Sequence, residues 1–140
     1  MKLKVVDPKV INERNKNSMV EYLGIDITAV TEDYIEGTMP VDHRTHQPFG
    51  ILHGGANVVL AESLGSIASN LCVDPNEFYA VGLDINANHI AAVRNGHVIG
   101  RAIPVHIGRT THVWEIRITT PQGKLTCISR LTMAIVPKKG

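Results

Sequence analysis

The sequence predicts an α+β fold in which one antiparallel sheet wraps around a single long central helix. Three observations support this prediction. Between Ala56 and Cys72 apolar residues recur at intervals of three and four, which is the spacing of a buried helix. Two short strand-like runs precede this helix and four follow it, and in the later ones apolar and polar residues alternate. No other segment could cover the apolar faces of the helix, so the sheet is expected to do so.

Before the helix, the sequence predicts two short helical turns and two strands. Asp7-Pro8 starts a polar helical stretch to about Asn17, because proline is favoured at the first position of a helix. Ser18 followed by Glu21 fits a capping box for a further turn that ends at Leu23. Two strands joined by a tight turn at Glu32-Asp33, and then a polar loop, complete this part of the chain: Ile25–Val30, Tyr34–Pro40 and Val41–Phe49.

After the helix, which Asp74-Pro75-Asn76 closes, the period changes to the strand repeat of two. In the first strand, the apolar residues at every second position from Val81 to Ala87 are expected to share one face. Asn95-Gly96 and Gln122-Gly123 are hairpin signals, so the four strands are expected to form a meander. The predicted strands are Phe78–Ala91, Gly96–Ile107, Thr111–Thr120 and Lys124–Val136.

Length and composition predict one domain over residues 1–140, since 140 residues suffice for a single core. A net charge of +1 gives no reason to propose nucleic acid or an acidic membrane surface as a partner. No apolar run is long enough to cross a bilayer, and the N-terminus lacks the apolar region of a signal peptide, so we expect a cytoplasmic protein. Cys72 and Cys127 are expected to be reduced core residues rather than a disulfide.

Two features of the central helix indicate chemistry. Gly54 and Gly55 precede its apolar run, and the first amides of a helix lack partners, which makes this end a site for a polarised carbonyl or an anion. Glu62 is the one formal charge between Thr45 and Val73. Because burying an unpaired carboxylate is costly, Glu62 either points outward to water or faces a cleft as a general base or nucleophile.

These residues carry a specific resemblance. The segment from Gln47 to Ala56, with Ala61-Glu62-Ser63 on the helix, resembles the signature of hotdog-fold thioesterases, and within them the phenylacetic-acid-degradation-related branch. The match continues through Gly82–His89 and from His106-Ile107-Gly108 to Val113-Trp114. The resemblance implies a hotdog fold that hydrolyses an acyl-coenzyme A thioester, aryl-coenzyme A above all, with no metal and no bound cofactor.

The resemblance also implies a role for each catalytic candidate. Glu62 matches the residue that attacks the thioester carbonyl or activates a water, and the Gly54 N–H would polarise the thioester oxygen. Gln47 matches a side chain that assists there or positions the water, and His53 one that contacts the carbonyl or helps to release product. Ser66 matches a hydroxyl that orients the carboxylate or the water. Because active sites in this fold lie between subunits, Gln47 and Gly54 are expected to face Glu62 of a neighbouring chain.

Contacts with coenzyme A are implied at two further segments, with Gly82 near the acyl group. The expected substrate-binding residues are Gly55, Gly82, His89, Ile90, Ala91, Ala92, His106, Ile107, Gly108, Arg109, Thr110 and Thr111. The sequence departs from the family at Ala91, where close relatives carry a basic residue. It departs again at Arg109-Thr110-Thr111, where they carry serine-arginine-histidine. Arg109 and Arg94 could still meet phosphates, but a carrier-protein thioester is an alternative to free coenzyme A.

The same residues bear on other functions and on the assembly. His43, His46 and His53 form the one histidine cluster, whose spacing does not match a usual zinc ligand set, so no metal is expected. A hydratase of the same architecture would need an Asp/His pair that the equivalent segment does not offer. A non-catalytic acyl-ligand binder on the same scaffold stays open. The expected assembly is a dimer of dimers, the usual one in this branch.

A few side chains could belong either to the core or to the site. Trp114 alternates with an apolar face and is expected in the core. Arg44 is expected to be a solvated loop charge. The candidates for walls of an acyl pocket, which could equally be core, are Leu64, Ile67, Ala68 and Met19–Leu23.

Overall fold

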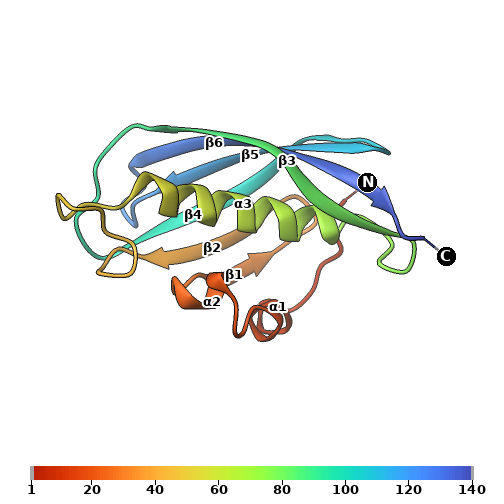
Figure 1. The fold of residues 1–140 in the computed structure, drawn as a ribbon, viewed down its shortest axis with the longest axis horizontal. Coiled ribbons are helices and arrows are strands. Elements are labelled where there is room, and N and C mark those ends of the chain that lie inside the picture. The colour runs from red at the N-terminus through yellow and green to blue at the C-terminus, as the bar shows by residue number, and fades with distance from the viewer. Residues whose placement is uncertain (1, 140) are drawn as a thin grey trace.

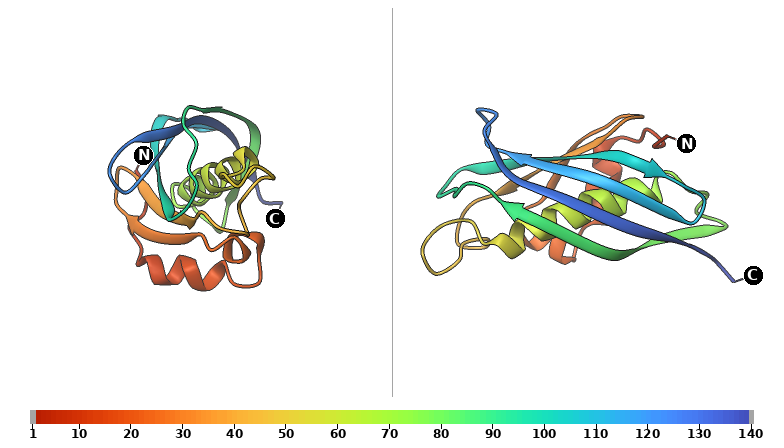
Figure 2. Two further views of the ribbon diagram at one scale, coloured as in Figure 1. Left: turned by 90° about the vertical axis from the view of Figure 1, so that its left-hand side faces the viewer. Right: turned by 90° about the horizontal axis from the view of Figure 1, so that it is seen from above.

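The computed structural model describes residues 2–139, which form an antiparallel sheet curled around one helix (Figure 1). The elements in chain order are α1 (Pro8–Arg14), α2 (Met19–Tyr22), β1 (Asp26–Val30), β2 (Ile35–Pro40), α3 (Gly54–Asn70), β3 (Phe78–His89), β4 (His97–Ile107), β5 (Thr111–Thr119) and β6 (Leu125–Pro137). Seen end-on, α3 lies inside the curl of the sheet, and α1 and α2 lie outside it (Figure 2, left). The predicted α+β class and the wrapped central helix are confirmed, and this is the hotdog arrangement.

The central helix α3 packs one face on the sheet. Leu60, Leu64 and Ala68 are fully buried against it, so Leu64 and Ala68 belong to the core rather than to a pocket wall. Gly100 on β4 allows this close approach, because a Cβ at that position would lie 2.8 Å from a methyl carbon of Leu64. Although α3 is strongly apolar, no helix within residues 2–139 is long and apolar enough to cross a membrane.

The order of strands in the sheet is β1-β2-β4-β5-β6-β3. The hairpin signal at Gln122-Gly123 is confirmed, because β5 and β6 pair across it and Gly123 has a φ of +90°. The meander prediction is wrong for β3, which pairs with β6 instead of β4. Residues 90–96 separate β3 from β4, too many for a two-residue hairpin loop, and they carry the chain across to the far side, where β4 pairs with β2.

Strand β3 lies at the edge of the sheet and contains a bulge. Its pairing with β6 shifts between Gly82 and Asp84, which leaves Leu83 as the extra residue. The predicted apolar face is therefore wrong in its first half: Leu83 is 62% exposed, whereas Ile85 packs against the core. An extra residue reverses the alternation of side chains, and no sequence period signals it.

The N-terminal segment is fastened to the sheet by α1. Asp7 caps α1 as expected, its Oδ1 accepting a hydrogen bond from the Lys9 amide. The side chain of Asn12 accepts from the Ile27 amide at 2.8 Å and donates to the Ile27 carbonyl at 3.0 Å, which joins α1 to β1. These two bonds fix the place of α1 beside the sheet.

The capping box predicted for α2 does not form. Ser18 does occupy the N-cap position, but its hydroxyl donates to the carbonyl of Asn15 at 2.6 Å instead of accepting from the helix. The Glu21 carboxylate accepts from the amide of Asn17, a residue with a φ of +63°. The left-handed turn at Asn17 redirects the backbone. The Ser18 hydroxyl therefore binds a free carbonyl at the end of α1 instead of a free amide at the start of α2.

A buried polar cluster joins α3 to β5. The Ser69 hydroxyl accepts a hydrogen bond from Trp114 Nε1 at 2.6 Å and shares another with His112 Nδ1 at 2.9 Å. All three residues are fully buried, so Trp114 is a core residue as predicted. Burial lowers the pKa of His112 from its usual 6.5, since the imidazolium loses its hydration, and the charge of nearby His106 acts in the same direction.

We expect this cluster to make stability depend on pH. Because the pKa of His112 is lower in the folded than in the unfolded chain, the unfolded chain binds the proton first as the pH falls. The free energy of unfolding should therefore be highest above about pH 6.5 and decrease below it. In urea titrations between pH 7 and pH 5, His112→Gln should flatten this decrease, while the exposed control His97→Gln should keep it. An equal slope in all three proteins would contradict the assignment.

Both cysteines are free thiols in the core, as predicted. Cys72 and Cys127 are buried, and burial raises the pKa of the Cys72 thiol to about 11. Burial also raises the pKa of the Cys127 thiol. Since the thiolate is the reactive form, neither residue is suited to act as a nucleophile near neutral pH.

Candidate active site

The predicted catalytic residues fall into two groups, one at the N-terminus of α3 and one around the middle of the helix. The first group surrounds a cavity of about 300 Å³, here called the Gly54 cavity, which is lined by Gln47, Ile51, Leu52, Gly54, Asn57, His89, Ile90, Ala91 and Ala92. The second surrounds a cavity of about 400 Å³, the Glu62 cavity, which is lined by Asn15, Met19, Val20, Val58, Val59, Glu62, Ser63, Ser66 and Ile67. Both volumes are in the range of small-molecule sites.

The N-terminus of α3 presents one free amide at the Gly54 cavity. His53 is the N-cap residue, and its Nδ1 accepts a hydrogen bond from the Gly55 N–H at 2.7 Å. The Gly54 N–H has no hydrogen-bond partner in the described part of the chain. It lies at the positive end of the helix dipole, so it is a donor available to an oxygen in the cavity.

His89 and Asn57 form a contact beside this amide. A Cβ at residue 54 would lie 2.8 Å from His89 Nε2, so only glycine leaves room for the ring. Asn57 Nδ2 lies 3.3 Å from His89 Nδ1, and Asn57 is only 4% exposed. The sequence analysis missed Asn57. The signal that could have found it is a polar side chain in the first turn of an apolar helix, on a face that the core would otherwise fill.

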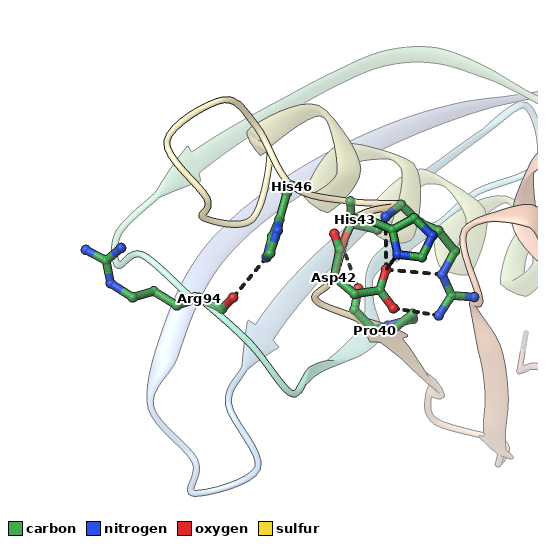
Figure 3. Close-up of polar contacts among 7 residues, drawn as sticks. Pro40, Asp42, His43, His46 and Arg94 are labelled. Atoms are coloured by element: carbon green, nitrogen blue, oxygen red, sulfur yellow. Dashed lines mark hydrogen bonds and ion pairs between the residues drawn. The ribbon is translucent and has the colours of Figure 1, made fainter.

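Gln47 belongs to a loop that is tied to the segment after β3. Its own Oε1 accepts a hydrogen bond from the Phe49 amide, and its backbone N–H donates to Ile51 at 2.8 Å. The preceding residue, His46, forms a hydrogen bond between its Nε2 and the Arg94 carbonyl at 2.9 Å (Figure 3). Figure 3 also shows the Arg94 side chain extending away from this loop.

The three clustered histidines do not converge on one point. His46 binds a backbone carbonyl, His53 caps α3, and His43 lies 4.0 Å from an Asp42 oxygen (Figure 3). Among residues 2–139 no group of three potential metal ligands was found. Arg44 is an exposed loop charge, as expected. It pairs with Asp42 at 2.7 Å, and this guanidinium holds the pKa of the Asp42 carboxyl well below its usual range.

The Glu62 carboxylate faces its cavity without a partner. Glu62 is half-buried, and no hydrogen bond or ion pair to it is present within residues 2–139. Its Oε2 lies against β3, where a Cβ at Gly82 would be only 2.6 Å away. Ser66, one turn further along α3, lines the same cavity. Of the two alternatives for Glu62, the geometry favours the carboxylate that faces a cleft.

The two groups lie apart within one chain. Gly54 and Glu62 are eight residues apart on α3, which corresponds to roughly 12 Å along the helix axis. The expected coenzyme A contacts divide in the same way. His89 pairs with Cys127 of β6, whereas Thr111, at the hairpin of His106–Thr111, pairs with Ala134. These β6 residues are seven apart (134 − 127), or roughly 23 Å along the strand.

Comparison with known proteins gives this divided site a family. A family model described as Thioesterase superfamily matches residues 49–127, more than half of the chain. The chain belongs to this superfamily. This thioesterase is 49% identical over 128 residues to the 1,4-dihydroxy-2-naphthoyl-CoA hydrolase of Escherichia coli, covering 91% of this chain and 93% of that protein. It is 46% identical over 128 residues to the proofreading thioesterase EntH of Cronobacter turicensis, with the same coverage.

Solved structures agree with this membership. The thioesterase resembles the crystal structure of a mutant of thioesterase PA1618 from Pseudomonas aeruginosa with a TM-score of 0.95 and 52% identity, covering 98% of this chain and 99% of that one. Relatives of this similarity establish that the protein is a thioester hydrolase with the hotdog fold.

Proposed function

We propose that this thioesterase hydrolyses acyl-coenzyme A thioesters, aryl-coenzyme A above all, with Glu62 as the catalytic carboxylate. The observation that carries the proposal is an unpaired, half-buried carboxylate that faces a cavity of ligand size. Two relatives support the choice of substrate. One is named for the hydrolysis of a naphthoyl-coenzyme A, and the other is named a proofreading thioesterase.

In the proposed reaction, the Gly54 N–H and the helix dipole stabilise the negative charge that develops on the thioester oxygen. Glu62 either takes a proton from a water that attacks the carbonyl carbon or attacks that carbon itself to form an anhydride, which water then hydrolyses. In both routes the C–S bond breaks, coenzyme A leaves as the thiol and the acid is released. Ser66 orients the carboxylate or the water, Gln47 assists at the carbonyl, and His53 aids product release.

The proposed active site contains two copies of the chain. Strand β3 runs alongside α3 with Gly82 beside Glu62 and His89 beside Gly54, and its outer edge is open. If two β3 strands pair antiparallel about a two-fold axis, the Gly82 end of one lies beside the His89 end of the other. This arrangement brings Glu62 of one copy toward the Gly54 amide of the second copy. The coenzyme A contacts at His89–Ala92 and His106–Thr111 are completed in the same way.

The proposed assembly is a homotetramer, formed as a dimer of such dimers, in the cytoplasm. The exposed apolar side chains on the outer face of the sheet, such as Leu83 on β3 and Val105 on β4, offer surface for the second contact. Two buried free thiols fit a reducing compartment.

A single experiment tests the reaction and the assembly together. We expect the purified protein to release thiol from benzoyl- and naphthoyl-coenzyme A and to sediment as a dimer or a tetramer at assay concentration. The same acyl groups carried on an acyl carrier protein form the second arm, because Ala91 and Arg109 differ from the family pattern for gripping the nucleotide. Release from the carrier protein alone would move the substrate to that class. An active monomer would refute the shared site, and no release from either donor would refute the proposed reaction.

A further inference from the structure

A third cavity lies next to the Glu62 cavity along α3. That cavity, of about 280 Å³, is lined by Ile11, Arg14, Asn15, Ser66, Ile67, Asn70, Leu71, Pro75, Phe78, Tyr79 and Lys138. Asn15, Ser66 and Ile67 line both cavities. The two spaces therefore lie next to each other, and together they are here called the groove, which extends from Glu62 toward the C-terminal end of α3 beside α1. If Glu62 acts on the thioester, the acyl group has this groove available to it.

Asn15 is an unusual lining residue, because its side-chain amide is not used by the protein. Its backbone binds Ile11 and Ser18, but its side chain makes no hydrogen bond with any residue from 2 to 139, and Nδ2 is shielded from water. Its neighbours in the Glu62 cavity include the apolar side chains of Met19, Val20 and Val59. A buried donor without an acceptor is unfavourable. A ligand that supplies the acceptor therefore gains binding free energy from the new hydrogen bond.

Asn12 of α1 is an asparagine with a structural role and serves as a comparison for Asn15, the C-cap residue of that helix. Both of its side-chain polar atoms bond the backbone of Ile27, at 2.8 and 3.0 Å. Asn15 lies three residues further on and has no such bond. With no protein partner to hold it, its amide can rotate to meet a ligand in the groove.

We propose that Asn15 is a specificity-determining residue, which donates a hydrogen bond from Nδ2 to an oxygen carried by the acyl group. Asn15 shares the groove with Ser66 and Ile67, which lie four and five residues beyond Glu62, or roughly 6 to 7.5 Å along the helix. The oxygen recognised is therefore remote from the thioester, as at the para position of a benzoyl ring, and not adjacent to it. This inference rests on the proposed function, since it assigns the groove to the acyl group.

The test compares substrates that differ by one atom. In 4-methoxybenzoyl- and 4-ethylbenzoyl-coenzyme A, an ether oxygen is exchanged for a methylene of similar size. We expect the natural protein to prefer the methoxy compound by roughly five- to tenfold in kcat/KM. The ether oxygen accepts a hydrogen bond from Asn15 Nδ2, whereas the ethyl group leaves this donor unpaired. Asn15→Leu should reduce this ratio to about one by slowing the methoxy substrate. The ortho-substituted pair should show no preference in either protein.

The unfolding temperatures of two variants show whether Asn15 recognises substrate or stabilises the fold. Asn15 has ordinary right-handed helical angles, φ −80° and ψ −7°, so leucine fits the backbone there. Asn15→Leu should unfold at the same or a higher temperature than the natural protein, because no hydrogen bond is lost. The matched control Asn12→Leu loses two bonds, so it should unfold at a lower temperature and keep the methoxy preference.

The outcomes distinguish the two proposals. A ratio that is unchanged in Asn15→Leu, while both substrates are hydrolysed, would refute the role of Asn15 and leave the reaction intact. If the natural protein releases no thiol from either compound, the proposed reaction fails. In that case, calorimetry measures the dissociation constants of the methoxy and ethyl compounds. Tighter binding of the methoxy compound that is lost in Asn15→Leu supports recognition by Asn15. Equal binding of the two compounds by the natural protein refutes that role.

Discussion

Glu62→Gln is expected to lower the rate of thioester hydrolysis by roughly 10³-fold or more, because an amide is neither a base nor an effective nucleophile. The loss should appear in kcat, since glutamine has the same size and leaves the cavity unchanged. The fold should not suffer. The carboxylate makes no hydrogen bond or ion pair in the described chain, and removing a half-buried charge relieves its desolvation. We therefore expect Tm to stay the same or rise while activity disappears, as is typical of functional residues.

The measurement is thiol release from benzoyl-coenzyme A, with Tm followed in parallel. Glu77→Gln is the matched control, because Glu77 is exposed and lies outside both cavities. It should retain full activity. A Glu62→Gln protein that works within tenfold of the natural rate would remove Glu62 from the mechanism.

Gly54→Pro is expected to lower kcat by roughly 10²- to 10³-fold, the usual effect of removing one oxyanion donor. Proline has no backbone N–H, so this change deletes the amide that is free at the Gly54 cavity. The helix should tolerate it, because Gly54 is the first residue of α3 and proline is favoured at that position. His53 has φ −67° and ψ 132°, the extended conformation that a following proline requires.

Gly54→Ala separates the loss of the amide from crowding. Both variants place a Cβ 2.8 Å from His89 Nε2, so the His89 ring must shift in either case, but alanine keeps the N–H. We expect alanine to retain far more activity than proline, and equal losses would assign the effect to His89 instead. Mixed oligomers of Gly54→Pro and Glu62→Gln chains should recover activity that neither variant has, because the mixed dimer contains one intact site. No recovery in confirmed mixed dimers would argue against a site shared between copies.

Local sequence patterns predicted the elements of this fold well and their neighbours poorly. The helix from Gly54 to Asn70 and six strands follow from apolar spacing, because spacing reports which faces of one element are buried. Strand order depends instead on contacts between distant segments. The turn at Asn95-Gly96 has the residues of a hairpin, yet the strands on either side of it bind different partners. The bulge at Leu83 was equally hidden, because a single extra residue leaves the composition of a strand unchanged.

For the candidate site, too, residues in a continuous motif were predicted and isolated residues were not. The residues of the glycine-led helix were found because they form a continuous motif, and the structure places Glu62 and Ser66 at one cavity and Gln47 and Gly54 at another. Asn15 was missed because an isolated asparagine in a polar stretch looks like any solvated one, and Asn57 because its place in the first turn of an apolar helix was not weighed. What distinguishes them is an unpartnered amide atom in a buried position, and that is a property of packing.

The wall formed by α1 and α2 has a consequence for how such enzymes diversify. Asn15, Met19 and Val20 line one side of the Glu62 cavity, yet they precede residue 49, where the match to the superfamily begins. On the roles proposed above, one wall of the acyl site therefore lies outside the stretch that carries the catalytic carboxylate. Substitutions at these three positions would reshape that wall and leave Glu62 and Gly54 in place, so a new acyl group could be accepted without a new reaction.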